Sequence, residues 1–286
     1  MSGDIDLKRI LKAVASSETI VTPRLNQYLL SGRYDEALPQ WIVDFIDNEL
    51  TKPRYSAKGR FRASSAGSCE RYQHLRYLGV TSDKPIDPRL ANIFSDGKWR
   101  HLRWQAMLLH SGILLRPEEG LDWPARRAWA TMDGIGIVPD NHPKTAWRGK
   151  EFGFELKGAN PFGYKQDVKV NDEAKETHLD QVHRAFLAGG FDLYVMIYEN
   201  KSNQEWHEWV FEPDQERLAS QSAELDRLNA GVTEQRLAKM LPDCAARTGY
   251  TFHHGCPFGT RTGACVRAKI GWPDERRVRE LSERSK

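Results

Sequence analysis

Several features that mark well-known protein classes are missing from this sequence. Its apolar runs all fall short of the roughly 18 consecutive residues that a membrane-spanning helix requires. The first residues, MSGDIDLKRILKA, begin acidic and hold no apolar core, so they lack the pattern of a secretory signal. A P-loop of the form G-x-x-x-x-G-K-[ST], a G-x-G-x-x-G loop after a strand and the metalloprotease motif H-E-x-x-H are also absent. We therefore expect a cytoplasmic protein with no membrane association that is neither a nucleotide-driven motor nor a protease of that class.

Cysteine is scarce, and neither sign of charge dominates. The 286 residues include four cysteines, which in a cytosolic protein rarely form disulfides. The 42 Lys and Arg residues and the 39 Asp and Glu residues leave a formal net charge of +3, so the overall charge does not by itself indicate a nucleic-acid-binding protein. Hydrophobic residues make up 40% of the chain, which is enough to build a core at this length without disulfides.

Helical and strand-like segments alternate along the chain. Helical periodicity covers residues 5–50, and further helices are predicted over 69–78, 88–111, 172–189 and 214–240. Strand-like runs fill much of 113–158, where they predict antiparallel strands joined by a turn-rich loop, and return at 191–200 and 205–213. This order predicts an α/β or α+β core with helical material at both ends.

A basic segment separates the N-terminal helices from the rest of the chain. Residues 51–68, TKPRYSAKGRFRASSAGS, contain no acidic residue. The basic residues of this segment are Lys52, Arg54, Lys58, Arg60 and Arg62. Such a run is either a solvated loop or a segment that contacts phosphates, and both interpretations remain open.

The sequence FELKG holds the strongest candidates for chemistry. Glu155 and Lys157 are two residues apart, so on a strand they project from the same face. Asp133, in TMDGIG on the preceding strand, would lie beside Glu155 in a hairpin. Two carboxylates at one strand end suit Mg²⁺ or Mn²⁺, and a divalent ion with an activated water can hydrolyse a phosphodiester. Asp140 also precedes the pair, but its Pro/Asn/His surroundings are typical of a turn, so we favour Asp133.

Two further polar residues lie on the predicted helices around this strand pair. His101, in SDGKWRHL, is either a structural histidine or a third metal ligand, and Gly97 lies one turn before it on the same helix face. Gln181, in HLDQVHRAF, is either a surface residue or a partner for the lysine, a water or the DNA backbone.

The ordered set Gly97-x-x-x-His101, Asp133, Glu155-x-Lys157 and Gln181 resembles the PD-(D/E)XK nuclease superfamily, and more narrowly its RecB-like branch. The resemblance covers roughly residues 62–270. It implies a restriction-endonuclease-like core with a mixed sheet flanked by helices. It also implies that His101, Asp133, Glu155 and the backbone carbonyl of Leu156 hold Mg²⁺ or Mn²⁺, with Lys157 and Gln181 supporting the reaction.

The four cysteines bracket these motifs. Cys69 precedes them and a C-terminal trio follows, consisting of Cys244, Cys256 and Cys265. Four thiolates suffice for one [4Fe–4S] cluster or one structural zinc ion, and sequence cannot choose between the two. The layout is similar to that of the iron–sulfur exonucleases of the AddB and CRISPR-associated Cas-four type, phage-encoded members included. The resemblance implies a structural cluster that ties the chain ends around the nuclease core.

The resemblance divides the chain into three parts. Residues 1–60 would be a helical N-terminal extension with a basic linker, residues 61–270 the nuclease domain with its cluster, and residues 271–286 a basic tail. The expected activity is metal-dependent exonuclease cleavage of DNA in recombination, repair or replication, in a bacterial or phage-infected cell and beside a recombination or replication protein. Arg54, Lys58, Arg60 and Arg62 would contact the DNA. The alternative is a non-catalytic DNA-binding or adaptor protein with a nuclease-like fold.

Overall fold

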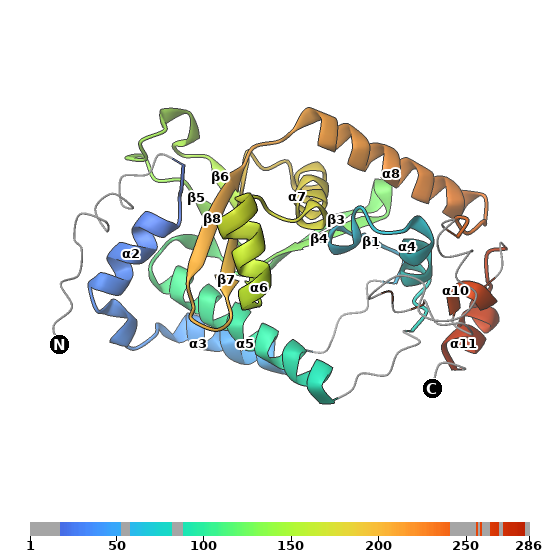
Figure 1. Ribbon diagram of the computed structural model, residues 1–286, viewed down its shortest axis with the longest axis horizontal. Helices are drawn as coiled ribbons and strands as arrows, with labels where there is room; N and C mark the ends of the chain where they lie inside the picture. The colour runs from blue at the N-terminus through green and yellow to red at the C-terminus, as the bar shows by residue number, and fades with distance from the viewer. Residues whose placement is uncertain are drawn as a thin grey trace.

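Two mixed sheets flanked by helices form the fold of this computed structural model (Figure 1). It describes residues 18–52, 58–81, 88–240, 256, 258, 264–268 and 271–283. The predicted mixed sheet between helices is therefore confirmed. Within these ranges no helix combines the length and apolar character that crossing a membrane requires.

The larger sheet has five strands in the order β2-β5-β6-β7-β8. The strands are β2 (Leu114–Arg116), β5 (Gly134–Ile137), β6 (Glu151–Ala159), β7 (Leu193–Asn200) and β8 (Trp206–Phe211). β5 and β6 are the predicted antiparallel pair, with Gly134 opposite Phe154, whereas β6 and β7 run parallel, with Gly153 opposite Tyr194. This pattern places the carboxyl ends of β6 and β7 at the same edge of the sheet.

A smaller sheet has the order β1-β4-β3. Its strands are β1 (Phe61–Arg62), β3 (Glu119–Trp123) and β4 (Ala128–Met132). β4 and β5 are separated by a single residue, Asp133, at which the chain passes from one sheet to the other. The division of 113–158 into two sheets was not predicted, because strand periodicity carries no information on which strands pair.

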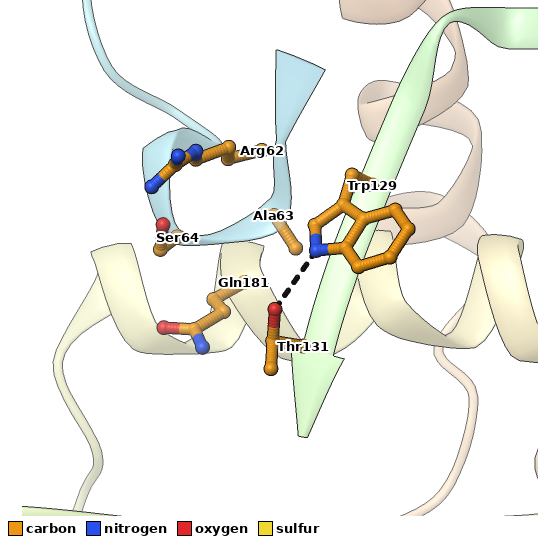
Figure 2. A pocket seen from close by; sticks show the side chains of 6 residues that line it. All are labelled: Arg62, Ala63, Ser64, Trp129, Thr131 and Gln181. Atoms are coloured by element: carbon orange, nitrogen blue, oxygen red, sulfur yellow. Dashed lines mark hydrogen bonds between the residues drawn. The ribbon is translucent and has the colours of Figure 1, made fainter. Parts of the chain in front are cut away.

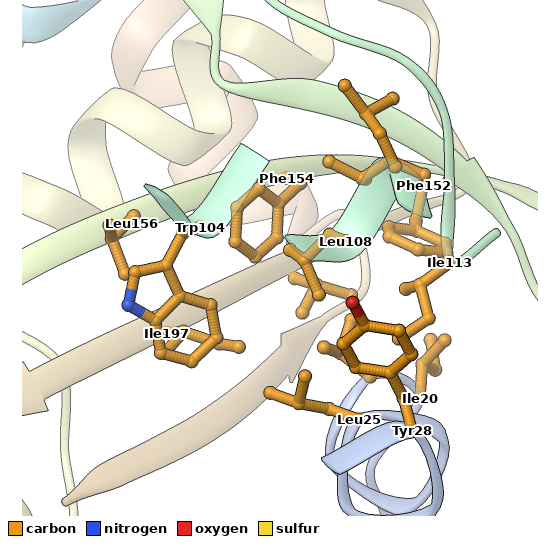
Figure 3. Close-up of a cluster of buried hydrophobic side chains, with 14 of the residues drawn as sticks. Ile20, Leu25, Tyr28, Trp104, Leu108, Ile113, Phe152, Phe154, Leu156 and Ile197 are labelled. Atoms are coloured by element: carbon orange, nitrogen blue, oxygen red, sulfur yellow. The ribbon is translucent and has the colours of Figure 1, made fainter. Parts of the chain in front are cut away.

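The two faces of the larger sheet are covered by different helices. Along β7, Leu193, Val195 and Ile197 face one apolar cluster, in which α5 (Pro88–His110) and the N-terminal helices α2 (Thr22–Leu30) and α3 (Gln40–Thr51) pack (Figure 3). Tyr194 and Tyr198 face the opposite cluster, beneath α7 (Glu176–Gly189), α6 (Pro161–Tyr164) and a π-helical turn over Lys165–Asn171. The alternation is the period of two that a strand buried on both faces requires.

Helices at the far end of the molecule complete the fold. α8 (Gln215–Thr233) packs on the small sheet, and α4 (Glu70–Tyr77), α10 (Ala264–Arg267) and α11 (Glu275–Glu283) lie at the opposite end from α2 (Figure 1). Leu75, Phe258, Ala264 and Leu281 share one apolar cluster there.

The predicted helices are largely confirmed, with changes at their ends. The expected helical stretch of 5–50 contains α2 and α3, separated by a short 3-10 turn at Arg33–Asp35, while residues 1–17 lie outside the described residues. The expected helix of 214–240 ends at Thr233. Beyond it Gln235 adopts a left-handed φ of 50°, which a continuing α-helix does not accommodate.

Candidate active site

Asp133 is fixed at the seam between the sheets by hydrogen bonds to its neighbours. Its backbone N–H donates to the Phe154 carbonyl at 2.9 Å, and its carbonyl accepts from Gln105 Nε2 at 2.8 Å. The Leu156 N–H donates to its carboxylate oxygen Oδ2 at 2.7 Å. The carboxylate, 13% exposed, is therefore aimed from the end of β4 toward the middle of β6.

Glu155 and Lys157 project from the same face of β6, as the strand period predicts. Lys157 Nζ donates to Glu155 Oε1 at 2.6 Å and to Gln181 Oε1, on α7, at 2.8 Å. Gln181 Nε2 donates to the same Glu155 oxygen at 3.0 Å. Tyr194, on β7, donates to the other oxygen, Oε2, at 3.3 Å. The Glu155 carboxylate therefore accepts hydrogen bonds from three elements of the fold.

His101 approaches the same centre from α5. Its Nδ1 lies 2.9 Å from Asp133 Oδ1, and its side chain is 35% exposed. Burial lowers the pKa of His101, but the Asp133 and Glu155 carboxylates outweigh it, so the pKa is raised overall. Burial raises the pKa of Glu155. The Lys157 ammonium lowers this pKa, and the Asp133 carboxylate raises it further. The Asp133 and Glu155 carboxylates therefore repel each other here, and a bound cation would reduce this repulsion.

The donor chemistry at this centre suits a hard divalent cation. Carboxylates, a carbonyl and an imidazole are the ligands that Mg²⁺ and Mn²⁺ accept. Among the described residues, however, no three His, Cys, Asp or Glu side chains are arranged as a formed metal site. The Glu155 carboxylate is instead bonded to Lys157, Gln181 and Tyr194. The ligand types therefore fit a divalent ion. To bind one, the Glu155 carboxylate would have to give up one of its present hydrogen bonds.

A cleft of about 400 Å³ opens beside Lys157 and His101. Three further basic side chains line it, from α5, the loop before α7 and the turn after β7, and each lies beside an acid: Arg100 by Glu199, Lys175 by Asp167 and Lys201 by Asp96. His178 of α7 lines it as well. Ile93 and Phe94 of α5 add an apolar wall and are 43% and 50% exposed. Basic and exposed apolar groups together are what an unpaired nucleic-acid strand contacts.

A smaller hollow of about 150 Å³ lies on the other side of Gln181 (Figure 2). Arg62 and Ser64 line it from β1 and the 3-10 turn Ala63–Ser65, and Trp129 and Thr131 line it from β4. Trp129 Nε1 donates to Thr131 Oγ1 at 2.9 Å, which holds the indole ring against the strand. Guanidinium, hydroxyl and amide groups suit an anion such as a phosphate.

The residues predicted to contact DNA occupy different places. Arg62 lines the smaller hollow. Arg60 forms a two-point ion pair with Asp122, at 2.6 and 3.0 Å, and Lys58 Nζ lies 4.0 Å from Glu275 at the C-terminal end of the fold. Arg54 lies outside the described residues. The structure therefore brings Arg62, but neither Arg60 nor Lys58, to a hollow at the candidate site.

Three of the four cysteines lie in the described part of the chain. Cys256 and Cys265 pack against the same apolar cluster, and Cys69 immediately precedes α4 of that cluster. Burial raises the pKa of the Cys265 thiol to about 11, with Cys69 and Cys256 adding to the rise and Arg71 opposing it. These thiols from distant segments are therefore within electrostatic range of one another. Cys244 lies outside the described residues.

Several residues at the site were not predicted. The sequence places Tyr194 in an apolar strand and gives no signal that marks Lys175, His178 or Lys201. The available signal for Tyr194 is that the apolar strand has a tyrosine at a position where a phenylalanine would fill the same space. Asp140, the alternative acid, lies exposed in the turn after β5.

Comparisons with known proteins give structural likenesses at low sequence identity. Neither a family model nor a curated protein matches the sequence. The alkaline exonuclease LHK-Exo from Laribacter hongkongensis matches with a TM-score of 0.40 and 13% identity, over 62% of this chain and 89% of its own. Its complex with dAMP matches with a TM-score of 0.38 and 11% identity, over 62% and 90%. The protein SSO0001 matches with a TM-score of 0.39 and 14% identity, over 77% and 92%.

Proposed function

We propose that this protein is a metal-dependent DNA exonuclease of the PD-(D/E)XK type, acting in recombination, repair or replication. The observation that carries the proposal is the meeting of Asp133, Glu155 and Lys157 beside a basic cleft. Hydrolysing a phosphodiester requires ligands for a divalent ion, a cation near the developing charge and a surface that binds phosphates. Candidate residues for all three requirements lie within one region of the fold, which supports the proposal.

His101, Asp133, Glu155 and the Leu156 carbonyl would hold Mg²⁺ or Mn²⁺. When bound, such an ion supplies polarisation of the scissile phosphate and a lowered pKa for the attacking water. Asp133 is already oriented for this task by the Leu156 amide. His101, hydrogen-bonded to Asp133, adds a nitrogen donor from the opposite side.

Lys157 provides positive charge at the reacting group. Its ammonium lies between Glu155 and Gln181, so two acceptors fix its position at the wall of the cleft. An ammonium held there would orient the attacking water and stabilise the charge that develops on the phosphate. Gln181 supports Lys157 and also reaches the smaller hollow.

The two hollows support an enzyme that acts at strand ends. The larger cleft would receive the strand through Arg100, Lys175 and Lys201, and the smaller hollow is large enough for a single phosphate-sized group. A hollow of about 150 Å³ beside Gln181 would accommodate a terminal phosphate better than a continuous strand. This is the basis for proposing an exonuclease.

The test is digestion of linear DNA labelled at either end, single-stranded and duplex, with Mg²⁺ or Mn²⁺. We expect metal-dependent degradation by the wild type and a loss of at least about a hundredfold in Lys157→Ala, the range for removing one transition-state stabilising group. The position of the label that is released reports the polarity of digestion.

Lys150→Ala is the matched control, because Lys150 precedes the same strand and is 40% exposed beside Asp192. It should digest DNA at the wild-type rate. Folded wild-type protein that binds DNA without degrading it under any divalent ion would contradict the nuclease proposal and favour the non-catalytic DNA-binding or adaptor protein.

We also propose that Cys69, Cys244, Cys256 and Cys265 hold a structural [4Fe–4S] cluster. What supports it is that Cys69, Cys256 and Cys265, from distant segments, interact electrostatically. No three of these side chains form a ready-made metal site within the described ranges, so binding would require them to move together and lose their thiol protons. Zinc is the alternative occupant of the same four ligands.

Anaerobic purification followed by metal and sulfide analysis separates these occupants. A cluster predicts about four irons and absorbance near roughly 400 nm, both lost in Cys256→Ser, whereas zinc predicts a colourless protein with one metal ion. Protein without either metal, whose fold and spectrum are unchanged in Cys256→Ser, would contradict both.

A further inference from the structure

A buried phenol reaches the candidate active site from the strand next to Glu155. Tyr194 is 0% exposed and its hydroxyl donates to Glu155 Oε2 at 3.3 Å. The opposite oxygen, Oε1, receives Lys157 and Gln181. Tyr194 therefore holds a different corner of the carboxylate from the two residues already assigned to the site.

A hydroxyl at this position has a cost unless it is used. Burying an unpaired hydroxyl is unfavourable, and phenylalanine would fill the same volume of an apolar strand without that penalty. A phenol hydroxyl can donate one hydrogen bond, and here its acceptor is Glu155 Oε2. The strand therefore presents a hydrogen-bond donor to a carboxylate that also lies near Asp133.

The surrounding residues fix the direction of this hydroxyl. Gly153 lies opposite Tyr194 on β6, and a Cβ at Gly153 would come within 2.9 Å of the Tyr194 ring. Phe186 of α7 packs edge-on against the ring with centroids 5.9 Å apart. The ring occupies space that Gly153 leaves open, and Phe186 closes it from the other side.

We propose that Tyr194 is a positioning residue for Glu155, an inference that rests on the proposed nuclease function. Lys157 and Gln181 hold the Oε1 side of the Glu155 carboxylate. Tyr194 would hold the Oε2 side, so that the carboxylate stays oriented toward Asp133 and the divalent ion that would bind there. The phenol does not touch the reacting atoms but preserves the geometry of a ligand that does.

The test is Tyr194→Phe in the full chain, which removes the hydroxyl and keeps the ring. Partners behind a metal ligand typically change metal affinity or activity about 10–100-fold, so we expect about tenfold weaker Mn²⁺ binding by calorimetry without DNA. The value of kcat should fall by a similar factor while KM for DNA stays near that of the wild type.

Tyr164→Phe is the matched control. Tyr164 is 2% exposed in the same apolar cluster, and its hydroxyl has no hydrogen-bond partner within the described part of the chain. It should leave Mn²⁺ affinity and kcat unchanged.

Wild-type Mn²⁺ affinity and kcat in Tyr194→Phe would overturn the inference. Glu155→Gln separates this failure from failure of the proposed function. If Glu155→Gln abolishes Mn²⁺ binding and DNA degradation while Tyr194→Phe changes neither, the nuclease stands and the positioning role does not. If Glu155→Gln retains both, the assignment of the active site fails together with the role of Tyr194.

Discussion

Lys157 Nζ donates to Gln181 Oε1 over 2.8 Å, and this bond joins a residue of the larger cleft to a residue of the smaller hollow. Lys157 lines the larger cleft and Gln181 lines the smaller one. A strand whose end occupies the smaller hollow would therefore place its neighbouring phosphodiester near Lys157. One hydrogen bond thus connects Gln181, which would contact the strand end, with Lys157, which would act on the neighbouring phosphodiester.

Replacing Gln181 tests this connection. Gln181→Met keeps the length of the side chain but removes the acceptor for Lys157 and the donor to Glu155. We expect kcat to fall at least about tenfold, or roughly 1.4 kcal/mol in the barrier. Steady-state degradation assays would measure it, with Gln166→Met as the control, since Gln166 is exposed and bonds Asn171. Unchanged kcat in Gln181→Met would show that Gln181, although buried beside Glu155, has no part in the reaction.

A buried ionic group holds α7 in place behind Gln181. Arg184, fully buried, pairs with Glu224 of α8, and both bond to Gln73 of α4, at 2.9 Å for Arg184 and 2.6 Å for Glu224. Arg184→Met leaves the Glu224 carboxylate buried without its cation, so the free energy of unfolding should fall by about 3–5 kcal/mol.

Urea unfolding would measure this loss. Arg184→Met/Glu224→Met removes both charges, so it should be more stable than the sum of the two single losses predicts. Strictly additive losses would mean that the two charges do not depend on each other for their stability.

Acid should destabilise the protein through His178. Burial, together with the charges of Lys157 and Lys175, lowers the pKa of His178 to about 3 from 6.5. Between these two values the unfolded chain binds a proton that the folded chain does not, so this contribution is present above pH 6.5 and is lost as the pH falls toward 3. The slope can reach about 1.4 kcal/mol per pH unit.

Unfolding in urea at pH 7.5 and pH 5 would measure the effect. His178→Gln should show a smaller difference between the two pH values than the wild type, because its side chain does not titrate. An equal difference in both proteins would assign the acid sensitivity to other groups.

The first described helix depends on a single distant carboxylate. Glu208 of β8 accepts the backbone N–H groups of Ile20 at 2.6 Å, Val21 at 2.9 Å and Thr22 at 2.6 Å, at the start of α2. Glu208→Ala leaves these donors without their acceptor, at a cost of about 1–3 kcal/mol for each one that stays buried.

We expect Glu208→Ala to lower the free energy of unfolding by several kcal/mol on this basis. Limited proteolysis should cut the variant near residues 18–30 faster than the wild type. Exposed Glu173→Ala is the control and should change neither measurement. Wild-type resistance to protease in Glu208→Ala would show that apolar packing alone holds α2.

The sequence predicted well what depends on local periodicity. Glu155 and Lys157 share a face because a strand has a period of two, and Asp133 lies next to Glu155 because β5 and β6 form the expected antiparallel pair. His101 follows from the helical spacing of α5. These relationships involve neighbouring elements of the chain, and short-range patterns encode them.

What could not be predicted depends on the parallel pairing of β6 with β7. Tyr194 reaches Glu155 because the register places Tyr194 opposite Gly153, and Lys201 reaches the cleft because β7 ends beside β6. Parallel pairing joins strands separated by a whole helix, so its register is set by packing across the fold. The change of sheet at Asp133 was not predicted because strand periodicity does not specify which strands pair.

The bond between Glu208 and the start of α2 also has a meaning for how the chain is made. Ile20 and Glu208 are 188 residues apart, so at about 5–20 residues per second a ribosome needs roughly 10–40 s to deliver the second after the first. During that interval the earliest part of the protein has neither its cap nor the strands that bury Ile20, Val21 and Leu25. A nascent chain that stalls before β8 would therefore expose these residues to chaperones and proteases.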